Sequence, residues 1–194
     1  MAFFGLYLKK IVNYDLMNTF SYKNLTSIPK FKKIILNFGI PNLKLKYFLS
    51  SLLALEFLTN KKGKITKAKH LNIFFKIKKG DPVGCKIILK KSTIHSFYLK
   101  LGTAIFSNIK QSQIPKLQWN SKLTKAISFQ LKNPLLFTEL ENQFQHFKDI
   151  PQLDIVLLTN CKSSKEFLFL LQSIKIFPQY KKRITSKSNS VGRV

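Results

Sequence analysis

Positive charge is the feature that most limits how this chain can fold. Its 194 residues include 34 Lys and Arg against 8 Asp and Glu, a formal net charge of +26 at pH 7. Self-repulsion on this scale opposes a compact state unless anions neutralise it. The fold must therefore keep its lysines at the surface, and the charge predicts a polyanionic partner, either nucleic acid or an anionic membrane.

Apolar residues are frequent enough to build a core beneath this charged surface. The sequence is 45% hydrophobic and contains 18 Phe, which excludes a disordered basic arm. The length predicts one folded domain, which we place at residues 1–178. Residues 179–194 hold five basic side chains without apolar periodicity, and we expect a disordered basic extension that orders on RNA.

Uncharged stretches are short throughout the chain. The longest runs from Ile34 to Leu43, ten residues, whereas a membrane-spanning helix needs about 20. The first sixteen residues lack a presequence pattern, so we expect no import signal. Two cysteines, Cys85 and Cys161, are too few for a disulfide framework and are expected to be reduced, partly buried thiols.

Four segments have the apolar spacing of a helix: residues 3–18, 43–58, 92–106 and 163–174. In the first, Ile11 is expected on the face that packs on the domain. The second is leucine-rich on a broad face and is predicted to be a core helix. Ser92 is placed as the N-cap of the third helix. Ser163 and Glu166 match a capping box that opens the fourth.

Extended structure is predicted in six short segments: residues 32–39, the region around Ile65, and residues 74–77, 85–89, 126–131 and 154–160. The sequence KKGDPVG, residues 78–84, predicts a turn. Residues 111–125 are polar and irregular, and residues 133–151 have no clear assignment.

Catalytic chemistry has few candidates among the eight carboxylates, which are scattered along the chain. Glu139, Glu141 and His146 come closest to a constellation, but their spacing favours a solvated loop. The histidines and cysteines lack zinc-ligand spacing, and neither GxGxxG nor GxxxxGK[ST] is present. We therefore expect no enzyme, no metal and no cofactor.

Lysines are densest at residues 61–79, where they alternate with apolar side chains. Such a run is either a solvated face or a phosphate-binding patch. Phe74 and Phe75 lie within it. Core packing is the more frequent fate of such aromatics, and stacking on bases is the alternative.

Four ordered segments resemble the universal large-subunit ribosomal protein L five family. They are DLMNTFSYKNLTSIPKFKKIILNFG, ITKAKHLNIFFKIKKGDPVGCKIIL, FTELE and LDIVLLTNCKSSKEFLFLLQSIKIFP. The second is the most specific, because it parallels the family's ITKA phrase and its GCK strand with the same spacing. Together the matches span about residues 14–178. A glycine-rich phrase of the family is replaced here by LQWNSKLTKAISFQ, and the arm after Pro178 has no family counterpart.

The resemblance implies an α+β fold, a mostly antiparallel sheet with helices packed on one face. The family is not enzymatic and attaches 5S rRNA to the large subunit. By this resemblance we expect 5S rRNA and large-subunit rRNA as partners, together with P-site tRNA, neighbouring large-subunit proteins and a small-subunit head protein, and no membrane.

Candidate RNA-binding residues follow from the same resemblance. Asn37 matches the family's Asn in LNMG, whereas Lys61 and Ile88 replace a Gln and a Thr that bind RNA in the family. The residues expected to contact 5S rRNA are Lys32, Lys33, Asn37, Lys61, Lys62, Lys64, Lys67, Lys69, Lys86 and Lys90. The loop expected to face tRNA contains His70, Lys76, Lys78, Lys79 and Asp81.

The sequence also indicates a location for the protein and leaves an alternative function open. Arg183 and Arg193 are the only arginines, which is typical of an AT-rich genome. We place the chain in the mitochondrial matrix, in the mitochondrial ribosome, with a plastid or an AT-rich bacterial cytoplasm as alternatives. The rival function is a peripheral basic module that binds anionic membranes through FFGLYLKKI, or binds non-ribosomal RNA.

Overall fold

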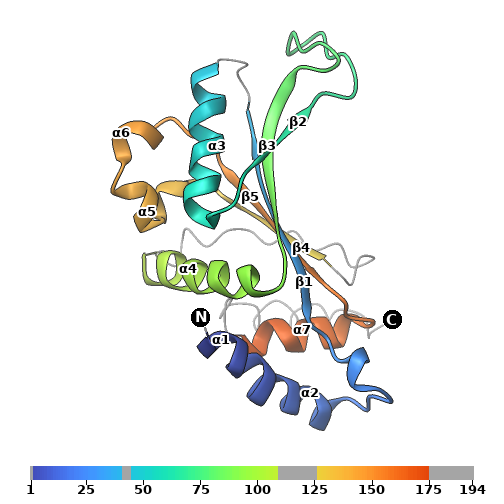
Figure 1. Cartoon of the computed structure of the whole chain (residues 1–194). Helices are drawn as coiled ribbons and strands as arrows, with labels where there is room; N and C mark the ends of the chain where they lie inside the picture. The colour runs from blue at the N-terminus through green and yellow to red at the C-terminus, as the bar shows by residue number, and fades with distance from the viewer. Residues whose placement is uncertain (1, 41–44, 109–125, 175–194) are drawn as a thin grey trace, which may run out of the picture.

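A five-stranded antiparallel sheet organises the computed structural model, which describes residues 2–40, 45–108 and 126–174 (Figure 1). The strands are β1 (Phe31–Gly39), β2 (Lys64–Lys67), β3 (Pro82–Leu89), β4 (Ala126–Leu131) and β5 (Leu153–Thr159). Their spatial order is β2-β3-β1-β5-β4, and every neighbouring pair is antiparallel. The predicted α+β class is confirmed. The predictions for residues 111–125 and 179–194, and for Pro178, concern residues outside the described ranges.

Helices account for most of the remaining described chain. They are α1 (Ala2–Tyr7), α2 (Asn13–Thr19), α3 (Leu45–Thr59), α4 (Ser92–Asn108), α5 (Thr138–Glu141), α6 (Phe144–Phe147) and α7 (Ser164–Ser173). A π-helical segment, η1 (Leu8–Val12), joins α1 to α2, and short 3₁₀ turns lie at η2 (Leu25–Ser27) and η4 (Pro134–Leu136). No helix within these described ranges combines the length and apolarity needed to cross a membrane.

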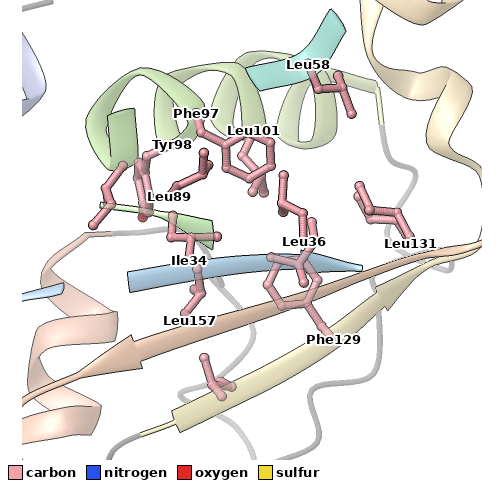
Figure 2. Packing of buried hydrophobic residues seen from close by; sticks show 14 of the residues in the cluster. Ile34, Leu36, Leu58, Leu89, Phe97, Tyr98, Leu101, Phe129, Leu131 and Leu157 are labelled. Carbon is pink, nitrogen blue, oxygen red and sulfur yellow. The ribbon is translucent and has the colours of Figure 1, made fainter. Parts of the chain in front are cut away.

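Alternation of apolar and polar residues explains which face of the sheet is buried. In β1, Ile34, Leu36 and Phe38 are buried, and in β5 every second residue from Leu153 is buried. Figure 2 shows Phe97 and Leu101 of α4 packed over this inner face, with Leu58 of α3 beside them. Burial of these side chains supplies the main stabilising term of the fold.

In the N-terminal helical segment, the prediction that Ile11 packs on the domain is wrong. Phe4, Val12 and Leu16 are buried, whereas Ile11 is exposed. The amide of Asn13 donates to the carbonyl of Leu8, a π-type bond that widens the turn. Because the turn is wider, side chains four residues apart stay on the same face of the helix. Val12, and not Ile11, therefore faces the domain. Phe4 is thereby unavailable for a membrane, since it is buried.

Helix α3 is only partly the core helix that its leucines predict. Ala54, Leu55 and Leu58 are buried, but Leu49 and Leu53 are exposed. One face of the helix packs toward the sheet, and its opposite face is also apolar. The expectation that all these leucines cover the core is therefore wrong.

The C-terminal described helix begins as its sequence predicts. Ser163 Oγ accepts a hydrogen bond from the amide of Glu166 at 3.2 Å, and Glu166 Oε2 accepts from the amide of Ser163 at 3.4 Å. The capping box is confirmed. Helix α4 begins at Ser92 itself, so this residue is the first residue of the helix and the prediction that it is the N-cap is wrong by one position.

Short helical pieces fill the segment that the sequence leaves unassigned. Asn133 Oδ1 accepts from the amide of Leu135 at 3.1 Å and opens η4, which is followed by α5 and α6. Lys100 Nζ of α4 lies 2.9 Å from Glu139 Oε1 of α5 and donates to the carbonyl of Leu58 at 3.1 Å. This lysine therefore joins α3, α4 and α5.

The two cysteines are free and buried, in line with the prediction of reduced thiols. Burial raises the pKa of the Cys85 thiol to about 12, and it also raises the pKa of the Cys161 thiol. Both side chains are therefore protonated core residues at neutral pH.

Candidate nucleic-acid interface

The side of the sheet away from α4 forms an open face, made by the outward side chains of all five strands. One row crosses it completely, because the registers place each member opposite the next: Lys64, Lys86, Asn37, Asp154 and Gln130. We call these five side chains the polar row. With strands about 4.8 Å apart, the polar row is about 19 Å long.

Two lysines stand side by side at one end of the polar row. Lys64 and Lys86 are direct cross-strand partners, and both are exposed. Like charges directly opposite each other destabilise a sheet. An anion between them removes that repulsion, which makes this end of the row a candidate phosphate site.

The centre of the polar row has a different chemistry. Asn37 is half-buried and can both donate and accept, whereas the neighbouring carboxylate of Asp154 can only accept. Asp154 Oδ1 is buried and has no hydrogen-bond partner within the described structure. Buried polar atoms are nearly always satisfied, so a donor from a bound molecule fits this position.

A second row, two residues along each strand, is mainly apolar. It consists of Ile88, Ile35, Val156 and Ser128, again opposite one another. Ile88 is exposed, and the other three are half-buried. This row offers contact area to riboses and base faces, and Ile88 cannot donate the hydrogen bond of the Thr that it replaces.

The remaining lysines predicted for 5S rRNA are distributed around the sheet. Lys33 pairs with Leu158 on the open face, and Lys32 is the exposed extra residue of a β-bulge. Lys90 follows the end of β3, Lys67 ends β2 opposite Pro82, and Lys69 lies in the β2–β3 connection; all three lysines are exposed.

Two of the predicted lysines lie off the sheet. Lys61 and Lys62 are exposed in the turn between α3 and β2, outside the strand registers. The structure therefore does not add them to the polar row. In the turn itself, the amide of Gly63 donates to Glu56 Oε1 at 3.0 Å, which ties these residues to α3.

The β2–β3 connection is a hairpin that extends well beyond the sheet, as Figure 1 shows at the end opposite α7. The amide of Ala68 donates to the carbonyl of Asp81 at 2.8 Å, and the amide of Gly80 donates back to Ala68 at 3.0 Å. Further out, Asn72 and Ile77 exchange two bonds of 2.9 and 3.0 Å. The prediction of a strand at 74–77 is wrong, because this segment closes a tight turn.

Within this hairpin, Asp81 has a role in the turn. Asp81 Oδ2 accepts from the amide of Lys78 at 2.8 Å, and Gly80 adopts a φ of +96° that a side chain rarely tolerates. The predicted turn therefore ends at Asp81, since β3 already begins at Pro82. Asp81 shapes the loop and leaves the lysines to face outward.

Apolar side chains are exposed at the hairpin tip. Phe74 is 97% exposed, and Leu71, Ile73 and Phe75 are also exposed. The basic side chains of the loop are exposed around them: Lys69, His70, Lys76, Lys78 and Lys79. Core packing of Phe74 and Phe75, the more frequent fate of such aromatics, is therefore wrong here.

Sequence reasoning missed three members of the open face: Asp154, Gln130 and Ser128. Each is a polar residue between two apolar residues of a strand. The alternation was the available signal, since it assigns such positions to the face away from the core.

The carboxylates that came closest to a catalytic constellation do not assemble one. Glu139 is engaged with Lys100, while Glu141 and His146 are exposed. Burial alone would raise the pKa of Glu139, but the hydrogen bond and charge of Lys100 hold it below its usual value. Among the described residues, no group of three His, Cys, Asp or Glu could hold a metal ion.

Comparison with known proteins identifies relatives along almost the whole chain, although no family model matches it. The chain is 33% identical over 171 residues to the large ribosomal subunit protein uL5m of Reclinomonas americana, which covers 87% of this chain and 93% of that protein. It is 32% identical over 173 residues to uL5 of Wigglesworthia glossinidia brevipalpis, covering 88% and 94%. It is 31% identical over 169 residues to uL5 of Clostridium botulinum strain Loch Maree, covering 86% and 91%.

Proposed function

The chain belongs to the uL5 family of large ribosomal subunit proteins, and from this premise we propose that its open face binds 5S rRNA in the large subunit's central protuberance. The observation that carries the proposal is the polar row. It combines, on one face of the sheet, two adjacent exposed lysines, two amides and a carboxylate whose buried Oδ1 has no hydrogen-bond partner in the described structure.

Each part of the polar row has a different task in this proposal. Lys64 and Lys86, with Lys33 nearby on the same face, neutralise phosphates and set the position of the RNA. Asn37 and Gln130 can pair with base edges or 2′-hydroxyls, since each amide donates and accepts. Asp154 accepts from a base amino group or a 2′-hydroxyl and repels phosphate, so it favours one register of the RNA.

The hairpin tip is the part that we assign to P-site tRNA; by the family resemblance, another edge of the protein faces the small-subunit head. Its exposed Phe74 can stack on an unpaired base, and the surrounding lysines can hold phosphates of the same strand. The closing bonds at Ala68 and Asn72 support it at a distance from the sheet. One chain thereby contacts two RNAs with separate surfaces.

We also place the protein in the mitochondrial ribosome. The similarity to the uL5m protein supports this location, and so does the dominance of lysine among the basic residues. Bacterial uL5 proteins are also similar to the chain, at 31% and 32% identity. Imaging of a tagged chain tests the location directly: a signal that does not coincide with mitochondrial ribosomes would contradict it.

Binding to 5S rRNA is tested by filter binding of the full chain at 150 mM salt. We expect tighter binding of 5S rRNA than of an unrelated RNA of equal length. Lys86→Met should weaken 5S binding about fivefold, because one phosphate contact is lost. Lys148→Met removes the same charge from an exposed position beside α6 and serves as the control. Equal affinity of the two RNAs would refute the proposal.

A further inference from the structure

The outer side of α3 carries a large apolar residue in each turn, and the one carboxylate on that side, Glu56, accepts a hydrogen bond from the Gly63 amide. Leu45, Leu49, Leu53 and Phe57 follow one another at four-residue intervals, and we call them the outer stripe. Their exposed fractions fall from 72% at Leu45 to 37% at Phe57. Residues four apart are neighbours on a helix, so the four side chains form one continuous strip, which ends where the ring of Phe57 packs edge-on against Phe147 of α6.

Such a helix is unusual at a free protein surface. The opposite side of α3 is already buried through Ala54, Leu55 and Leu58. A helix that is apolar on both sides is normally covered on both sides. A contiguous exposed apolar patch of this kind marks an interaction site.

Positive charge borders the outer stripe at both of its ends. Lys46 is exposed in the first turn of α3, beside Leu45. At the other end, the Gly63 amide is bound by Glu56, and a Cβ on Gly63 would come within 2.6 Å of Leu52. The turn therefore folds back against α3 and brings the exposed Lys61 and Lys62 to the end of the stripe.

We propose that the outer stripe docks an amphipathic helix of another large-subunit protein, apolar on one side and flanked by Asp and Glu. Helices recognise one another through apolar side chains at such intervals. Acidic flanks on the partner would meet Lys46, Lys61 and Lys62 and fix the orientation of the docked helix. The proposal rests on membership of the family, and it is independent of the RNA-binding role of the open face.

Charge and chemistry disfavour the other occupants. A second copy would bring two chains of net charge +26 together at lysine-bordered surfaces. The chain's own residues 179–194 are basic and lack apolar periodicity, and RNA finds no hydrogen-bond donor on the four apolar side chains.

Photo-crosslinking in assembled large subunits tests the proposal. A benzophenone amino acid at Leu49 is activated in purified particles, and the crosslinked species is identified by mass spectrometry. We expect a peptide of another large-subunit protein with alternating apolar and acidic helical spacing. A crosslink to RNA, to lipid, to a second copy or to residues 179–194 would overturn the proposal, as would no crosslink at all.

A parallel probe at Ile88 distinguishes this result from the proposed function. Ile88 lies on the open face and is expected to crosslink to rRNA. If the Ile88 probe gives no crosslink to RNA while the Leu49 probe still crosslinks to a protein, RNA binding by the open face is refuted and the docking proposal stands. The opposite result would refute the docking proposal alone.

A pair of double variants tests the contribution of the stripe. Leu49→Gln with Leu53→Gln should reduce co-assembly of the crosslinked partner at least about tenfold, because two apolar anchors are lost. Leu25→Gln with Leu99→Gln alters two exposed leucines outside the stripe and should retain it. Thermal unfolding of both proteins checks that the fold persists. Equal retention of the partner by the two variants would overturn the proposal.

Discussion

At the scale of single residues, the open face carries side chains of both charges. Lysines attract the RNA backbone, whereas Asp154 places a carboxylate in the middle of the same surface. In a chain of net charge +26, one carboxylate has little effect on overall attraction. Its effect is local, because its buried Oδ1 needs a donor at one position. Specificity for a particular RNA register is therefore expected from this residue more than from the lysines.

The variant Asp154→Ala tests the role of this carboxylate, because the two possible roles predict opposite changes in RNA affinity. If the carboxylate only repels phosphate, the variant should bind every RNA more tightly. We expect 5S rRNA binding to weaken about tenfold instead, since a base or ribose donor loses its acceptor. Filter binding measures the effect. Asp149→Ala makes the same charge change at an exposed position before β5 and should bind 5S rRNA slightly more tightly.

Glu139 predicts a pH-dependent contribution to stability. Its pKa is held below the ordinary value of 4.5, mainly by Lys100 against the effect of burial. A lowered pKa stabilises the fold above 4.5, and this stabilisation is lost as the pH falls through the folded-state pKa. Glu139→Gln should therefore cost about 0.5 kcal/mol at pH 7, a value limited by solvent screening, and the cost should shrink as the pH falls through the folded-state pKa. Urea unfolding at several pH values measures the difference, and a constant cost would contradict the assignment.

At the scale of elements, the long hairpin and the outer stripe share one property. Both expose apolar side chains that the fold leaves mostly uncovered, in contrast to the inner face of the sheet. The hairpin holds its tip beyond the sheet through two sets of backbone hydrogen bonds between its strands. Helix α3 carries apolar residues on both of its sides, and only one side is buried. Such surfaces contribute little to folding, so their retention favours contact with neighbours in an assembly.

The hairpin tip allows binding and stability to be separated. Phe74→Ser should change the free energy of unfolding by less than about 0.5 kcal/mol, because the ring is almost fully exposed. The same variant should reduce crosslinking of the tip to P-site tRNA in intact ribosomes severalfold. Phe129→Ser, at a buried ring of β4, is the contrast and should cost about 3 kcal/mol or more. Unchanged tRNA crosslinking by Phe74→Ser would exclude the ring from that contact.

At the scale of the whole molecule, the net charge provides long-range attraction to RNA, and the fold determines which surface the RNA contacts. The net charge of +26 draws the chain to RNA from any direction, whereas the sheet presents one surface to it. A core of apolar side chains from β1, β3, β4, β5 and the surrounding helices supports this surface. The lysines therefore act at the periphery of a scaffold that apolar burial holds together.

Salt sensitivity is the whole-molecule prediction. If about 6 to 10 lysines contact phosphates, affinity for RNA should fall about 10³- to 10⁵-fold between about 50 and 200 mM salt. Filter binding across this range gives the slope. Lys86→Met should reduce the slope by about one contact, whereas Lys148→Met should leave it unchanged. A salt-insensitive affinity would contradict phosphate binding by the lysines.

Much of the fold could be predicted because local signals act on local structure. Short apolar and β-branched runs predicted β1, β3, β4 and β5, and the Ser163 capping box predicted α7. Predictions failed where long-range packing decided the outcome. Leu49 and Phe74 have the chemistry of core residues, and only the position of the remaining chain leaves them exposed.

The sequence by itself determined the family, the class of fold, the basic surface and the identity of Asn37 and Lys86 as candidates. Only the tertiary structure decided that Lys64, Lys86, Asn37, Asp154 and Gln130 form one row. The physical reason is that these residues come from strands separated by up to about a hundred residues of chain. Their alignment depends on strand order and register, which the packing of the whole core establishes.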